Sequence, residues 1–375
     1  MRLLDRYLLR ELLFWLAVFF VGFLLIWVTF DLSLELHKLQ EAHLRGKEVV
    51  EYCIYSIPEF MPMALPVSLL LAMLYALTNH ARHNEITAMR AAGISLVRLC
   101  APYFAVGLLA SVALFAFNER YSARAADAAD AILIRHVEQS PSAERNEIKK
   151  NIFVNTSPGG QNRTWTQVGY NTKTREIIQP DVIWTPTNGG PRFELSADIA
   201  VWGNHAWHFY GKVIENIIDP GTIRLLVTNA LAMPQFTETP EQIQSEINVM
   251  KYYNHINKTH TADVPLKDIL NYLRWHPHPD RKMRNWIYTK LHGRFAGPFA
   301  CLVVVFVAIP FAAGSGRRNV FVGVAASIFI FFAYFVLQQV GFSFAETGWL
   351  PPWFGAWFPN LFFVVGSLVM MSRVR

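Results

Sequence analysis

The stretch LLFWLAVFFVGFLLIWVTF, residues 12–30, contains no charged side chain. A helix that crosses a bilayer needs about 20 mainly apolar residues, because the hydrocarbon core is about 30 Å thick and each residue adds about 1.5 Å. The run is too long for the apolar part of a cleaved signal peptide, and no small-residue cleavage site follows it. We therefore predict a retained spanning helix. Five further runs meet the same requirement: 60–79, 99–118, 295–316, 319–345 and 347–372.

The composition agrees with a membrane protein. Hydrophobic residues make up 53% of the chain, charged residues only 17%, and the mean hydropathy is +0.23, which is too apolar for an ordinary soluble protein. The net charge of +6 could suggest nucleic acid, but the arginines lie at the ends of apolar runs and form no basic stripe. We therefore expect a membrane as the partner surface and no nucleic acid.

The basic residues in the short connections predict the orientation, because lysine and arginine resist translocation. Ten lie on one side and three on the other. Both termini are therefore expected in the cytoplasm, and the long segment 119–294 outside it. The larger set is Arg2, Arg6, Arg10, Arg82, Arg90, Arg98, Arg317, Arg318, Arg373 and Arg375; the smaller set is Lys38, Arg45 and Lys47.

The external segment contains a change of periodicity. Residues 119–139 are alanine-rich and predict a helix, whereas residues 152–227 alternate like strands between glycine-containing turns. Helical periodicity returns over 239–275, with Thr239-Pro240-Glu241 as the predicted helix start. We thus expect an α-helical integral membrane protein with six transmembrane helices, and an external β domain of sandwich type between the third and fourth. The domains are a first transmembrane half at 1–118, an external domain at 119–294 and a second transmembrane half at 295–375.

The chain lacks the common catalytic motifs. It has no phosphate-binding loop of the Gly-x-x-x-x-Gly-Lys-Ser/Thr type, no His-Glu-x-x-His and no Gly-x-Ser-x-Gly. Cys53, Cys100 and Cys301 all lie in apolar segments, and no carboxylate or cysteine is spaced to complete a metal site with His276 and His278. We expect no metal, no cofactor and no catalytic residue, so that any ATP hydrolysis occurs on another chain.

The loop 81–98, ARHNEITAMRAAGISLVR, joins the second and third spans. Its composition predicts a short helix from Glu85 to Ala92 that ends at Gly93 and lies at the membrane surface. A basic amphipathic loop can also serve only as an anchor to anionic lipid. From the residues alone, both interpretations stay open.

Three motifs together resemble the LptF/LptG (YjgP/YjgQ) permease family. They are RYLLREL at 6–12, NEITAMRAAGIS at 84–95 and LPPWFGAWFPNLFF at 350–363, and they occur in the expected order within the same six-helix layout. The resemblance implies a permease subunit of a lipopolysaccharide exporter in the bacterial inner membrane, multi-pass, with both termini cytoplasmic and the large domain periplasmic. The region 152–227 would then be a β jelly roll.

The resemblance also implies partners. They are a separate ABC ATPase (LptB-like), a second LptF/LptG-type permease chain, LptC-like and LptA-like bridge proteins, and lipopolysaccharide or a related glycolipid as substrate. The resemblance makes the loop 81–98 the coupling loop, which binds the ATPase. Within it, Glu85 and Arg90 would engage the ATPase, and Met89 would add an apolar contact. Lys38 and Arg45 would bind the substrate phosphates. As alternatives, Arg90 pairs with lipid phosphate, and Lys38 and Arg45 form only a solvated helical face.

The alternative function is that of a membrane-anchored sensor or adaptor. Such a protein would also carry an external ligand-binding domain. Such a protein should have a recognisable cytoplasmic output domain, yet every segment predicted to be cytoplasmic is short. The sequence therefore favours the permease.

Overall fold

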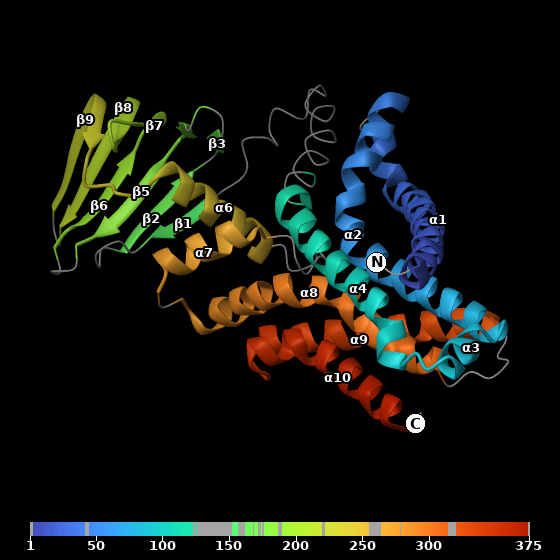
Figure 1. Ribbon diagram of the computed structural model, residues 1–375. Helices are drawn as coiled ribbons and strands as arrows, with labels where there is room; N and C mark the ends of the chain where they lie inside the picture. Colours follow the sequence, from blue (N-terminus) through green and yellow to red (C-terminus); the bar gives the residue numbers. More distant parts are fainter. Residues whose placement is uncertain are drawn as a thin grey trace. The chain divides into compact units, whose positions relative to one another are not determined.

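The computed structural model describes most of the chain, in two compact units. The described residues are 3–41, 45–122, 125, 152–156, 162–167, 169–171, 174, 176–186, 190–219, 222–254, 264–277, 279–313 and 320–373. The helical unit comprises residues 1–136 and 281–375, and the β unit comprises residues 137–280 (Figure 1). Each unit is described by itself.

Among the described residues of the helical unit, six helices are long and apolar enough to cross a membrane, which confirms the predicted number. The loop between the second and third carries the short helix α3 (Glu85–Ala91), and a π-helical turn, Asn118–Ser122, follows the third. The spanning helices are α1 (Leu3–Glu41), α2 (Gly46–Arg82), α4 (Leu96–Phe117), α8 (Arg281–Ala313), α9 (Val320–Thr347) and α10 (Pro352–Arg373).

The spanning helices differ in how much of their surface the unit buries. In the most apolar window of α2 and of α8, 72% of the residues are buried, whereas the value is 6% in α1 and 17% in α9. A core of leucine, valine and alanine side chains, with Tyr103 fully buried, joins α2, α4 and α8. α2 and α8 are therefore the centre of the unit, and α1 and α9 present apolar faces outward.

The helix boundaries differ from the predicted apolar runs, and the starts of α8 and α10 show why. α8 begins at Arg281, before the apolar run at 295–316, because hydropathy detects only the part of a helix that lies in hydrocarbon. α9 continues to Thr347, where the last run was expected to begin, and α10 starts at Pro352. Gly348 adopts a left-handed φ of 84° in this turn, and proline suits the first turn of a helix because its missing N–H needs no partner there.

In its described residues the β unit contains nine strands in one antiparallel sheet, which confirms an inserted β domain but differs from the expected sandwich of two sheets. The sheet is continuous and curled, in the order β1-β2-β5-β6-β8-β7-β4-β3, and β9 also pairs with β8. The strands are β1 (Ile152–Thr156), β2 (Asn162–Gln167), β3 (Gly169–Asn171), β4 (Glu176–Ile178), β5 (Asp181–Thr185), β6 (Arg192–Ser196), β7 (Ile199–Gly203), β8 (Ala206–Asp219) and β9 (Thr222–Met233).

Strand β8 explains why two sheets merge into one. Its first half pairs with β7 and its second half with β6, while β9 runs along the opposite side of both halves. The register shifts between Tyr210 and Val213, where Gly211 has a φ of +86° and an added Cβ would collide with the Asp198 carboxylate. Such a bulge bends a strand, so β8 directs its two partners into different halves of the sheet.

An aromatic core fills the inside of the β unit. Trp165, Trp207, Phe209 and Phe236 are fully buried and meet at ring-centroid distances of 5.5–6.1 Å. Helix α6 (Pro240–Asn254) packs Ile243 into the same core. It begins at Pro240, as predicted.

Helix α7 (Leu266–Trp275) is tied to α6 by the buried Asp268, which accepts hydrogen bonds from Ser245 and Asn248.

Of the helix predicted over 119–139, only the first residues and Ala125 are described. The others lie outside the described residues.

Candidate functional site: the polar cluster of α1, α2 and α3

Helix α3 has clear signals at both ends. Asn84 precedes it in a left-handed conformation, φ 59°, which asparagine tolerates better than most residues. At its end Gly93 has a φ of +84°, and the Ile94 N–H donates to the Met89 carbonyl at 3.1 Å. Only glycine adopts this conformation without strain, so the helix ends there as the sequence predicts.

The carboxylate of Glu85, in the first turn of α3, is bound by the rest of the chain. His80 Nδ1 of α2 lies 2.7 Å from Glu85 Oε2, and the Tyr7 hydroxyl of α1 donates to the two carboxylate oxygens at 3.3 and 3.4 Å. The Glu85 side chain is 33% exposed. Glu85 therefore joins α3 to two spanning helices while part of it still reaches solvent.

A second carboxylate, Glu11, lies on the other side of the same imidazole. Glu11 Oε2 is 3.4 Å from His80 Nε2, and Glu11 Oε1 accepts a hydrogen bond from Asn79 Nδ2 at 3.0 Å. The Tyr7 ring lies beside the imidazole, with a centroid separation of 5.6 Å. The His80 side chain is 0% exposed, so the polar cluster of Tyr7, Glu11, Asn79, His80 and Glu85 is centred on a buried imidazole.

This polar cluster brings two of the sequence motifs together. Tyr7 and Glu11 belong to RYLLREL and Glu85 to NEITAMRAAGIS, and Tyr7 and Glu85 are 78 residues apart in the chain. Tyr7 and Glu11 are four residues apart, so they share one face of α1. That spacing was the available signal for a site, but sequence reasoning identified only Glu85 and missed Tyr7, Glu11, Asn79 and His80.

The other two predicted coupling residues have different surroundings. Met89 is partly buried and, together with Ile86, packs against the hydrophobic core of the helical unit. Arg90, in the last turn of α3, is exposed. Met89 therefore faces the core of its own chain, whereas the exposed Arg90 is accessible to another molecule.

The predicted substrate-binding residues lie near the turn between α1 and α2. Lys38 belongs to α1, but its side chain lies outside the described residues. Arg45 precedes the first turn of α2, is exposed, and its backbone N–H donates to Glu48 Oε2 at 2.7 Å. The part of these two residues in binding phosphate stays a prediction.

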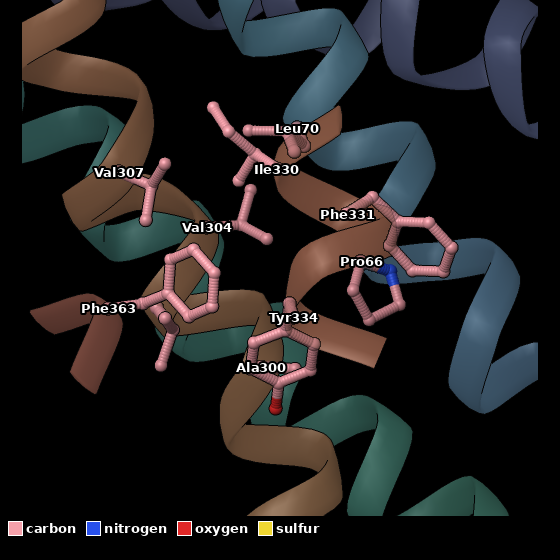
Figure 2. Close-up of a pocket in the computed structure, with 10 residues that line it drawn as sticks. Pro66, Leu70, Ala300, Val304, Val307, Ile330, Phe331, Tyr334 and Phe363 are labelled. Carbon is pink, nitrogen blue, oxygen red and sulfur yellow. The ribbon is translucent and has the colours of Figure 1, made fainter. Parts of the chain in front are cut away.

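An apolar pocket lies between four spanning helices. Pro66 of α2, Val304 of α8, Phe331 of α9 and Phe363 of α10 line it, with Tyr334 at one end (Figure 2). The Tyr334 hydroxyl donates to Asn360 Oδ1 at 2.7 Å, and Asn360 Nδ2 donates to the Ala296 carbonyl at 2.9 Å. These bonds satisfy the polar atoms, so the surface that remains is apolar. Within the described ranges, no group of three or more His, Cys, Asp or Glu side chains is placed to hold a metal ion.

A family model described as "Lipopolysaccharide export system permease LptF/LptG" matches residues 6–373, which is nearly the whole chain and includes all three motifs. A search of curated proteins found no match.

Proposed function

Because the chain belongs to the LptF/LptG family of lipopolysaccharide export permeases, we propose that it is the transmembrane subunit of an ABC-type exporter. In this proposal it extracts the lipid from the inner membrane and passes it to a periplasmic bridge, and a separate ATPase supplies the energy. The family match over residues 6–373 carries the proposal. Both termini and α3 face the cytoplasm, and the β unit faces the periplasm.

Helix α3 is the proposed contact with the ATPase. Its exposed Arg90 offers a cation to the partner, and Glu85 passes the movement of α3 to α1 through Tyr7 and to α2 through His80. A short helix that a partner displaces can move both of these spanning helices at once. The proposed role of Glu85 is therefore mechanical, since the contacts described for it join α3 to α1 and α2.

Two exposed surfaces support the further proposed partners. The outward apolar faces of α1 and α9 suit packing against a second permease chain, since their most apolar windows are only 6% and 17% buried. In the β unit, β9 pairs only with β8 among the described strands and exposes Leu225, Leu226 and Val227. An exposed apolar edge strand is a site where another sheet can add a strand, which suits a bridge protein with a β domain of its own.

Replacement of Glu85 tests the proposed coupling. We expect Glu85→Arg to leave membrane insertion intact, because Glu85 lies outside the buried core. The variant replaces the carboxylate beside His80 with a cation, so ATP hydrolysis should no longer drive glycolipid release, or the ATPase should fail to co-purify in mild detergent. Glu51→Arg reverses an exposed charge on α2, at the opposite end from α3, and serves as the matched control.

The outcomes separate the alternatives. Normal coupling in Glu85→Arg with an ATPase bound would leave α3 as a membrane-surface anchor. If the wild-type chain co-purifies with neither an ATPase nor a glycolipid, the exporter assignment is wrong.

A further inference from the structure

The buried imidazole of His80 lies between carboxylates that belong to two other helices. Glu85 Oε2 of α3 is 2.7 Å from Nδ1, and Glu11 Oε2 of α1 is 3.4 Å from Nε2. Nε2 is buried and makes no aligned hydrogen bond, so Glu11 acts on it mainly as a nearby charge. Both nitrogens therefore face oxygen atoms that accept hydrogen bonds and cannot donate them when the carboxylates are ionised.

The chemistry of this arrangement favours one form of the ring. A neutral imidazole has one N–H and one lone pair, so one of its nitrogens would direct a lone pair at a carboxylate. The imidazolium donates from Nδ1 to Glu85 and places a positive charge between two negative ones, where the surrounding dielectric constant is low. The other titratable groups close to it are the Tyr7 hydroxyl of α1 and the Tyr103 hydroxyl of α4, which lies within electrostatic range of Glu11 and Glu85.

We propose that His80, as an imidazolium, is the positioning residue that holds α3 against α1 and α2. Helix α3 has only seven residues, and a helix of that length is not stable without contacts to the rest of the protein. Glu85 supplies such contacts from the first turn, and His80 neutralises Glu85 and the facing Glu11 together. Without the cation, the two carboxylates repel each other, and α3 loses its fixed position. A role for this joint in coupling rests on the proposed function, but the position of α3 does not.

Distance measurements between spin labels in the full-length chain test whether His80 fixes the position of α3. The labels are placed at Leu3→Cys, which is exposed at the start of α1, and at Ala88→Cys, which is exposed on α3. The three native cysteines are replaced by alanine, and the chain is reconstituted in lipid nanodiscs without a partner protein. We expect one narrow distance distribution for the wild-type chain, because the contacts of His80 with Glu85 and Glu11 hold α3 in one position.

His80→Gln should give a broad distribution, because a neutral amide cannot replace the cation between the two carboxylates. His83→Gln is the matched control: His83 is three residues away, is exposed, and contacts only a helix carbonyl, Asn79 O at 2.9 Å, among the bonds that the structure describes. It should behave like the wild type. A narrow distribution in His80→Gln, or a broad one in the wild type, would overturn the proposal. The measurement needs no ATPase, so its outcome is independent of the exporter assignment.

Discussion

Arg163 and Glu238 form an ion pair inside the β unit, where each side chain is at most 3% exposed. Arg163 Nη1 lies 2.7 Å from both oxygens of Glu238, and the guanidinium stacks over the Phe236 ring at 4.2 Å. The Glu238 backbone carbonyl accepts a hydrogen bond from the Trp207 indole at 2.7 Å. The pair thus attaches the segment after β9 to β2 and closes the aromatic core.

At the residue scale, we predict that Glu238→Gln destabilises the β unit by about 3 to 5 kcal/mol, because it leaves the Arg163 cation buried without its counter-charge. Hydrogen exchange of the β2 amides, followed by mass spectrometry, measures the local opening free energy. Lys267→Gln breaks an ion pair with Glu241 in which both side chains are about 70% exposed, and should change stability by less than about 1 kcal/mol. Equal exchange in the two variants would mean that the buried pair contributes no more than a surface pair.

At the scale of elements, the contact between α9 and α10 depends on glycine. A Cβ added to Gly341 would collide with the backbone carbonyl of Gly355, and one added to Gly355 would collide with that of Gly341. Both partners are backbone atoms, which cannot rotate away as a side chain can. The two helices therefore approach as closely as small residues allow, as is common between helices in membranes.

We predict that Gly341→Ala lowers the thermal midpoint of the purified protein in detergent, since overpacking in a core costs about 1 to 3 kcal/mol. Gly366→Ala makes the same change in α10, where an added Cβ meets nothing within 4 Å. That control should match the wild type or exceed it slightly, because alanine favours a helix. If the thermal midpoint of Gly341→Ala is as high as that of Gly366→Ala, then α9 and α10 can move apart without loss of stability.

At the scale of the whole molecule, the distribution of basic residues predicts which side of the membrane each unit occupies. The hairpin turn between β7 and β8 contains Asn204 and His205, both at positive φ, and His205 is exposed. Ala88 is exposed on α3, in the helical unit. These two positions should lie on opposite sides of the membrane.

We predict that an impermeant thiol reagent labels His205→Cys and spares Ala88→Cys in intact spheroplasts of cells that lack the other cysteines. After the membrane is made permeable, both variants should react, which controls for accessibility. Labelling of Ala88→Cys alone in intact spheroplasts would invert the proposed topology and place α3 out of reach of a cytoplasmic ATPase.

The sequence by itself determined the features that depend on local composition. Six uninterrupted apolar runs specified six spanning helices, because hydrocarbon requires a continuous apolar helix whatever its neighbours are. Alternating residues and glycine turns specified a β unit, and Gly93 specified the end of α3. Three short motifs were sufficient to indicate the family.

Only the tertiary structure decided which distant residues meet. Periodicity places Tyr7 and Glu11 on one face of α1, but it does not say that this face packs against His80 and Glu85. For the same reason Met89, which the motif suggested as a partner contact, packs into the chain's own core. The two expected sheets merge because β8 pairs with strands on both halves, and strand pairing is a long-range choice that a local pattern of alternation does not contain.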